Sequence, residues 1–175
     1  KKFIGTGKGI IKKASPVLDI NLHRKISEFN PDKVFILDIP IVSQEFINNT
    51  KQPIYWLDHH PLLKREKVNY FNPLQNSNEN PPTSYLAYQI TKNNLWLAVI
   101  GCIADWYYPD FIKDFIKQYP GVLEANSKNP EEILFNSKLS RVIKLIGLLL
   151  KDSTTEINKS ISVLEKIESP IELIE

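Results

Sequence analysis

Residues 54–60 read Ile-Tyr-Trp-Leu-Asp-His-His, and this stretch decides the fold. Four large apolar residues in a row, bounded by polar ones, predict a short strand that is buried on both faces. The run Val34-Phe35-Ile36-Leu37 has the same form. Between the two runs, Ser43 can cap a short helix that extends through Asn49. A strand, a helix and a second strand make a βαβ unit, so we expect two parallel strands that are neighbours.

Both predicted strands end in polar side chains. Asp38 follows the first strand, and Asp58-His59-His60 follows the second. Ligands of open parallel sheets bind outside the carboxyl ends of the strands. We therefore expect these acids and imidazoles to meet at one crevice.

The rest of the chain predicts one long loop and a series of helices. Residues 61–82 are polar and rich in proline and asparagine, which is typical of a loop. The segment Asn129-Pro130-Glu131-Glu132 is a strong helix start, with an asparagine cap and a first-position proline. Helices are expected over 83–92, 95–104, 110–119, 129–151 and from Ser153 onward. The chain therefore combines an α/β half with an α-helical half.

The composition is that of a globular protein. Of 175 residues, 42% are hydrophobic and 24% are charged, which excludes wholesale disorder. The single cysteine, Cys102, excludes an intramolecular disulfide framework and fits a reducing compartment. The longest apolar stretches, 95–104 and 142–150, are shorter than the roughly 20 residues of a membrane helix. Residues 1–13 do not resemble a signal peptide, so we expect a soluble, cytoplasmic protein with no membrane partner.

The residues that carry chemistry are Asp58-His59-His60 and Asp38. Carboxylates and imidazoles together suit manganese, zinc or iron, whereas magnesium favours oxygen ligands alone. If the strands adjoin, Asp38 and His59 can share a cation, and Asp105, at the end of an apolar helix, is placed to add a carboxylate. Such a site would activate water or clamp a phosphoryl oxygen. His60 would then act as a general acid or stabilise charge.

Structural roles are alternatives for these residues. The Asp-His-His stretch can be an exposed loop, Asp38 can cap a helix, and Asp105 can cap a helix or lie on the surface. The third histidine, His23, lies in a polar helical stretch and is expected at the surface.

Three further residues are weaker candidates for binding a substrate. Trp106, followed by two tyrosines, could stack the bases of a single strand, although packing is the favoured interpretation. Lys64 and Arg65 could contact a phosphate backbone, although a solvated loop is the simpler explanation. The net charge of +2 is too small to indicate a nucleic-acid partner by itself.

Three segments in a fixed order carry more information than Asp-His-His alone. Val34–Asp38 is an apolar strand that ends in aspartate, Tyr55–Pro61 contains Asp-His-His, and in Gly101–Trp106 a glycine precedes an aspartate by a few residues. Pro82-Thr83-Ser84-Tyr85 adds a helix start with small hydroxyl residues. On these segments, residues 32–110 resemble the DHH phosphoesterase superfamily, which includes RecJ-type exonucleases, nanoRNA and phosphoadenosine phosphatases, and family II pyrophosphatases.

The resemblance implies a fold and a set of residue roles. Residues 1–119 would form a DHH domain with a Rossmann-like parallel sheet and flanking helices, and residues 120–175 a helical tail or linker. Asp38 would bridge two Mn²⁺ ions, with Mg²⁺ as an alternative cofactor, and His59 and Asp105 would bind the second ion. His60 would contact the scissile phosphate, and Asp58 would orient the histidines.

The implied function is a RecJ-like nuclease that hydrolyses single-stranded DNA or short RNA with metal-activated water. The alternatives are a phosphatase for small substrates, such as a nucleotide or pyrophosphate, and an inactive scaffold with a protein partner in replication or repair. Residues 1–19 contain only Asp19 as an acid, so the aspartate-rich first motif is not found there, and no Gly-Gly-His motif follows Asp110. The sequence has no methionine, even at position 1, so we expect it to be processed or incomplete.

Overall fold

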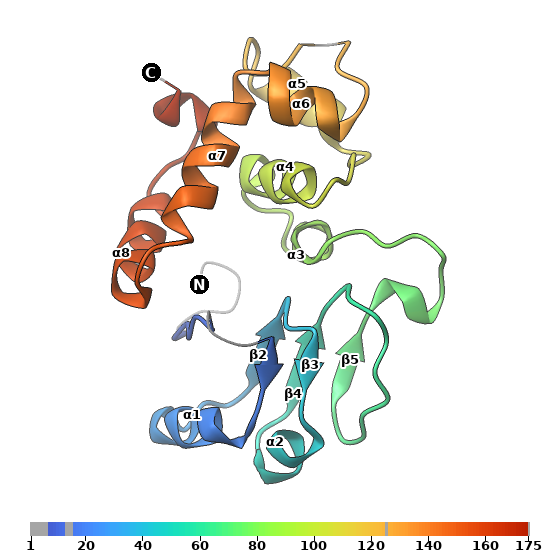
Figure 1. The fold of residues 1–175 in the computed structure, drawn as a ribbon, viewed down its shortest axis with the longest axis vertical. Helices are drawn as coiled ribbons and strands as arrows, with labels where there is room; N and C mark the ends of the chain where they lie inside the picture. The colour runs from blue at the N-terminus through green and yellow to red at the C-terminus, as the bar shows by residue number, and fades with distance from the viewer. Residues whose placement is uncertain (1–6, 13–15, 125, 175) are drawn as a thin grey trace. The chain divides into compact units, whose positions relative to one another are not determined.

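The two apolar runs form neighbouring parallel strands, as predicted. The computed structural model of the chain describes residues 7–12, 16–124 and 126–174 (Figure 1), so parts of the stretch 1–19 lie outside the described residues. Strand β2 (Val34–Leu37) pairs with β4 (Ile54–Leu57) in the register Val34↔Ile54 to Leu37↔Leu57. Helix α2 (Gln44–Asn49) lies between them in the chain, and the Ser43 side chain caps it by accepting from the Phe46 N–H at 3.1 Å.

Three strands were not predicted because they are only two or three residues long. Strand β5 (Asn69–Phe71) pairs in parallel with β4, so the three-stranded sheet has the order β2-β4-β5. It lies within the segment 61–82 that we expected to be a loop. Strands β1 (Val17–Leu18) and β3 (Ile41–Val42) form a separate parallel pair.

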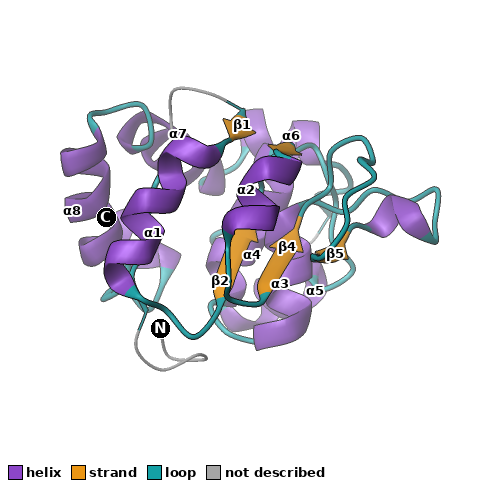
Figure 2. Cartoon of the chain, turned by 90° about the horizontal axis from the view of Figure 1, so that it is seen from below, coloured by secondary structure: helices purple, strands orange, loops and turns teal. Residues whose placement is uncertain are grey.

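Among the described residues of the sheet unit, one face of the main sheet is covered and the other is largely exposed, with Leu57 buried on it, which corrects the prediction that the strands are buried on both faces. Apolar residues from one face form a core with helix α1 (His23–Phe29) and α2, and Figure 2 shows both helices in front of the strands. On the other face, Phe35 is 48% exposed, Leu37 is 52% exposed and Tyr55 is 37% exposed. Phe35 and Tyr55 are register partners, and their rings stack at 5.3 Å.

The second core is built around one apolar helix. Helix α4 (Leu95–Ala104) is almost continuously apolar, and most of its side chains are buried. Around it lie five further α-helices and a final 3-10 helix: α3 (Thr83–Thr91), α5 (Ile112–Gln118), α6 (Pro130–Asn136), α7 (Leu139–Leu149), α8 (Thr154–Leu164) and η3 (Pro170–Leu173). Side chains from α4, α5, α6 and α7 form one continuous apolar cluster.

The helix expected over 129–151 is two helices. Asn129 caps α6 as predicted, because its side chain accepts from the Glu132 N–H at 2.8 Å. At Ser137 the backbone is extended, with φ −111° and ψ 164°. Its hydroxyl donates to the Ile133 carbonyl at 2.6 Å and accepts from the Ser140 N–H at 3.2 Å. One serine hydroxyl therefore bonds to the last turn of α6 and to the first turn of α7.

Two compact units make up the described chain. One consists of Lys12–Thr83, and the other of the described residues up to Ile11 and from Ser84 onward. We call them the sheet unit and the helical unit. The boundary between residues 119 and 120 that we expected does not coincide with this division, because α4 and α5 pack with the C-terminal helices.

The fold is α/β, with small parallel sheets and eight α-helices among the described residues. None of these helices combines the length and the hydropathy that crossing a membrane would require.

Candidate metal centre

Three predicted site residues come together in the sheet unit. Asp38 lies just after β2, and His59 and His60 follow β4 by two and three positions. One ligand atom from each of the three side chains lies within 4.8 Å of the others. Asp38 Oδ1 is 3.5 Å from His59 Nε2, and the rings of His59 and His60 meet edge to face at 4.7 Å. The parallel pairing of β2 and β4 produces this cluster, because it aligns the carboxyl ends of both strands.

The conformation of Asp38 is fixed by its surroundings. Its φ is 58°, in the left-handed region that side chains other than glycine seldom adopt. Its N–H donates to the Leu57 carbonyl at 3.0 Å, which extends the strand pairing by one bond. The Thr83 hydroxyl donates to Asp38 Oδ1 at 2.9 Å. Two hydrogen bonds, one to the backbone and one to the side chain, therefore hold Asp38 in place.

Asp58 orients His60 from a buried position. Its side chain is 0% exposed, its Oδ1 lies 2.8 Å from His60 Nδ1, and its Oδ2 accepts from the His60 N–H at 3.1 Å. With the Asp58 carboxylate as acceptor, Nδ1 of His60 is the donor in this contact. Nε2 is then the nitrogen that can bind a metal or a substrate. A histidine held by a carboxylate in this way is the usual arrangement behind a metal-binding imidazole.

Asn72 supports the same loop and was missed in the sequence. It is 3% exposed, and its Nδ2 donates to the His60 carbonyl at 2.8 Å and to the Tyr70 hydroxyl at 2.9 Å. Its Oδ1 accepts from the Leu74 N–H at 3.0 Å. The sequence signal was the pair Asn72-Pro73, which is typical of a helix start. Burial raises the pKa of Tyr70 above its ordinary value, so the tyrosine hydroxyl in this network is neutral.

Polar burial is concentrated at this site. Five polar or charged residues are buried among those described, and three of them contact Asp38 or His60: Asp58, Asn72 and Thr83. Buried polar groups are costly unless they are hydrogen-bonded. Three of the five buried polar side chains therefore hold Asp38 or His60 in position.

The donor set fits a divalent transition metal. One carboxylate and two imidazoles suit Mn²⁺, Zn²⁺ or Fe²⁺, whereas Mg²⁺ prefers oxygen ligands. The expected Mn²⁺ cofactor is therefore compatible with the residues present.

The remaining predicted residues lie elsewhere or have other contacts. Asp105 is the C-terminal cap of α4 in the helical unit, where its N–H donates to the Gly101 carbonyl at 3.1 Å. The Arg65 Nε donates to the Val42 carbonyl at 2.6 Å, and its Nη1 donates to the Lys64 carbonyl at 2.8 Å. Both contacts fix the loop after β4. The metal-binding role of Asp105 and the substrate roles of Lys64 and Arg65 stay predictions.

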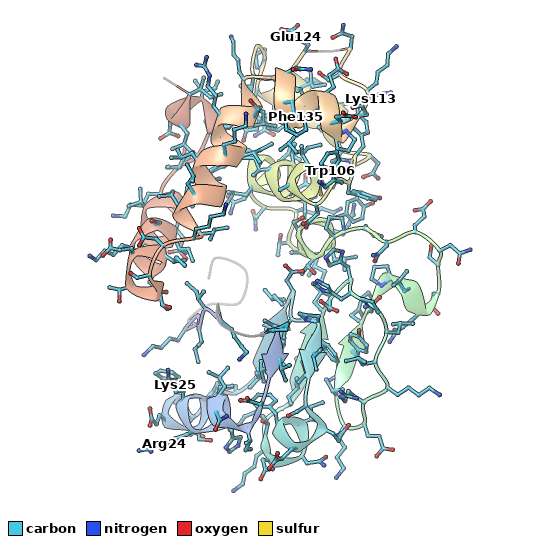
Figure 3. The ribbon with its side chains drawn as sticks, in the orientation of Figure 1. Arg24, Lys25, Trp106, Lys113, Glu124 and Phe135 are labelled. Atoms are coloured by element: carbon cyan, nitrogen blue, oxygen red, sulfur yellow. The ribbon has the colours of Figure 1, made fainter. Side chains whose placement is uncertain are left out.

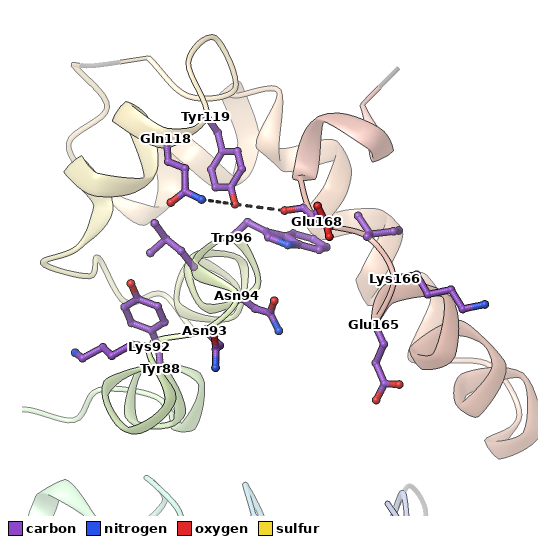
Figure 4. A pocket seen from close by; sticks show the side chains of 12 residues that line it. Tyr88, Lys92, Asn93, Asn94, Trp96, Gln118, Tyr119, Glu165, Lys166 and Glu168 are labelled. Atoms are coloured by element: carbon purple, nitrogen blue, oxygen red, sulfur yellow. Dashed lines mark hydrogen bonds between the residues drawn. The ribbon is translucent and has the colours of Figure 1, made fainter. Parts of the chain in front are cut away.

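The helical unit contains a cavity of about 460 Å³ that holds none of the predicted site residues. Figure 4 shows its walls, which come from α3, α4 and α5 and from the segment after α8. Trp96 lines it, and the buried Trp96 Nε1 finds no hydrogen-bond acceptor among the described residues.

Comparison with known proteins gives no family for the chain: no family model and no curated protein matches it.

Proposed function

We propose that this chain is a manganese-dependent phosphoesterase of the DHH type, and that its substrate is single-stranded DNA or short RNA. The observation that carries the proposal is the cluster of Asp38, His59 and His60, held at the ends of two parallel strands. Its support in the sequence is the order of the three motifs, of which the cluster contains two. In this proposal the sheet unit is part of a Rossmann-like DHH domain.

Asp38 and His59 are the proposed metal ligands in the sheet unit. Their ligand atoms are 3.5 Å apart, so they can share one cation with a small adjustment. The Thr83 hydroxyl occupies one lone pair of Asp38 Oδ1 and orients the carboxylate. The sequence resemblance adds Asp105 as a further ligand.

A divalent cation bound there supplies a Lewis acid for a phosphoryl oxygen and lowers the pKa of a water molecule. The residues of the chain supply the positioning. Asp58 fixes the His60 ring through Nδ1, which leaves Nε2 facing the substrate, where the doubly protonated ring donates to a phosphoryl or leaving-group oxygen. Asn72 holds the His60 carbonyl, so both the backbone and the ring of His60 are restrained. Preorganised donors of this kind stabilise charge that develops in a transition state.

The test is a time course of hydrolysis with Mn²⁺ on 5′-labelled single-stranded DNA and RNA. His59→Ala removes a proposed ligand, and His23→Ala is the matched control. His23 lies in α1, where its Nε2 is 2.7 Å from the Asn49 carbonyl, outside the cluster. We expect stepwise shortening by the wild type and by His23→Ala, and none by His59→Ala.

Other outcomes separate the alternatives. Hydrolysis of nucleotides or pyrophosphate without cleavage of either polymer would replace the nuclease by a small-substrate phosphatase. Equal activity of His59→Ala and the wild type would refute the site. Absence of hydrolysis with every substrate would favour the scaffold.

A further inference from the structure

Helix α4 begins without a side-chain cap. The residue before it, Asn94, has a left-handed backbone, with φ 56° and ψ 55°, and among the described residues its side chain makes no capping hydrogen bond. A usual N-cap has an extended backbone, and its side chain accepts from an N–H of the first turn. No carbonyl within a helix can accept from its first N–H groups. The start of α4, a helix of ten residues, therefore offers N–H donors and the positive end of the helix dipole.

This end of α4 forms one wall of the cavity in the helical unit. Asn93, Asn94, Leu95 and Trp96 all line the cavity, and its other walls come from α3, α5 and the segment 165–168. Its volume of about 460 Å³ is within the range of small-molecule sites. The N–H donors of α4 therefore lie beside a space that is large enough for an organic ligand.

Trp96 adds a buried donor that has no acceptor. The residue is 1% exposed, and its Nε1 has no hydrogen-bond partner in the part of the chain that the structure describes. By comparison, the buried Trp56 Nε1 donates to the Ile39 carbonyl at 2.9 Å. Side chains of a helix lean toward its N-terminus, and Figure 4 shows the Trp96 indole extending from α4 toward the segment after α8. Native proteins seldom leave a buried donor unpaired, so Nε1 indicates an acceptor that a ligand supplies.

The charges around the cavity favour a ligand with a single negative charge. Lys92 and Lys166 line it, and so do Glu165 and Glu168, so the charges of the lining side chains cancel. The remaining positive potential is that of the helix end, which is equivalent to about half an elementary charge. Two nearby carboxylates oppose a dianion more strongly than a monoanion.

We propose that this cavity binds a small organic monocarboxylate. The carboxylate accepts from Trp96 Nε1 and from the N–H groups at the start of α4, because an anion at a helix N-terminus meets both donors and the dipole. The organic part fills the rest of the cavity against the side chains of Tyr88, Tyr119 and Ile167. All of these residues belong to the helical unit, so the site is independent of the proposed metal centre.

The indole N–H signals of the ¹⁵N-labelled full chain test the site by nuclear magnetic resonance. The sequence has three tryptophans, and Trp96→Phe identifies the signal of Trp96 by its loss. The other two are internal controls, because Trp56 already has an acceptor and Trp106, 60% exposed, lies at the surface beside Phe135 (Figure 3). We expect a titration with benzoate to move the Trp96 signal downfield and to saturate, while the other two signals stay in place.

Two further probes test the class of the ligand. Benzamide has the shape of benzoate without its charge, and we expect it to bind about 10-fold more weakly, because a hydrogen bond to a charged acceptor is the stronger one. Phenyl phosphate is largely dianionic at pH 7. It should also bind more weakly than benzoate, because of Glu165 and Glu168.

Two variants test the residues. Trp96→Phe keeps a ring but removes the donor, so its affinity for benzoate, followed by the backbone signal of Leu95, should fall about 10- to 100-fold. Glu165→Gln removes one negative charge from the lining, so its affinity for benzoate should rise about 2- to 5-fold. Glu165 is exposed, so this second variant is expected to fold like the wild type. It keeps the test decisive if Trp96→Phe fails to fold.

Four results would overturn the proposal. An unmoved Trp96 signal at millimolar benzoate would show that the donor is not part of a carboxylate site. Equal binding of benzamide or of phenyl phosphate would refute the monocarboxylate as the ligand. Unchanged benzoate affinity in a folded Trp96→Phe, or in Glu165→Gln, would place the binding elsewhere.

Discussion

The buried carboxylate of Asp58 lies 2.8 Å from Nδ1 of His60. A charged group with 0% exposure is costly to bury, so its two contacts with His60 must compensate for much of that cost. Nδ1 of His60 is therefore occupied by Asp58, whereas Nε2 is available to a metal or a substrate. Metal-binding imidazoles commonly have this arrangement.

Asp58→Asn should lower the activity while leaving the fold intact. The amide has the same shape but no charge, and it offers either a weaker acceptor or a donor to Nδ1 of His60. We expect the rate of Mn²⁺-dependent hydrolysis to fall about 10- to 100-fold, as is typical for residues that orient metal-site groups. The comparison is of kcat for the variant and the wild type at saturating Mn²⁺, and equal values would show that Asp58 does not position His60.

Thr83→Val should weaken metal binding, whereas Thr83→Ser should not. Valine matches the shape of threonine but removes the hydroxyl that donates to Asp38 Oδ1 at 2.9 Å. We expect about a 10-fold loss of Mn²⁺ affinity for the valine variant, measured by titration calorimetry. The serine variant keeps the donor and serves as the control. If both variants bind Mn²⁺ equally well, the hydroxyl does not orient the carboxylate.

Gly101→Ala should destabilise the helical unit, because α3 and α4 approach closely at this position. A Cβ at residue 101 would lie 2.6 Å from Ser84 Cβ and 2.8 Å from Ser84 Oγ. Overpacking of this kind costs about 1–3 kcal/mol in the free energy of unfolding. Adding Ser84→Gly removes both atoms, so the double variant should regain stability relative to Gly101→Ala. Denaturant unfolding of the four proteins tests this, and additive losses in the double variant would exclude the contact as the cause.

Cys102 should be inert to thiol reagents in the folded protein. Burial raises the pKa of its thiol from 9.0 to about 12, so the reactive thiolate is scarce at neutral pH. We expect reaction with a disulfide reagent at pH 8 only after denaturant is added. Rapid reaction of the native protein would contradict the burial of this helix face.

The same shift predicts how stability depends on pH. Because the folded protein holds the thiol proton more tightly, the stabilisation is complete below pH 9 and declines as the pH rises toward 12. The free energy of unfolding of Cys102→Ala should therefore decline less than that of the wild type over this range. Parallel declines in the two proteins would refute the contribution of Cys102.

The sequence predicted the features that depend on local patterns. The apolar runs 34–37 and 54–57 became adjacent parallel strands, and Ser43 and Asn129 cap helices as expected. The cluster of Asp38 with the two histidines followed from the parallel pairing alone. These predictions succeeded because each depends on residues that are close in sequence or on a general rule of βαβ units.

Features that depend on distant partners could not be predicted. Strand β5 is three residues long and exists because β4 offers it a free edge. The sequence does not indicate which face of the sheet is exposed, because Phe35 and Leu37 are as apolar as the buried residues beside them. The break at Ser137 depends on two hydrogen bonds that a helical pattern does not reveal.

The central claim is that Asp38 and His59 bind a divalent cation beside His60. Electron paramagnetic resonance of Mn²⁺ distinguishes free from bound ions, so a titration of the wild type, His59→Ala and His23→Ala measures the site directly. We predict one site with equal affinity in the wild type and His23→Ala, and a loss of at least about 10-fold in His59→Ala. Equal Mn²⁺ affinity in all three proteins would contradict the account.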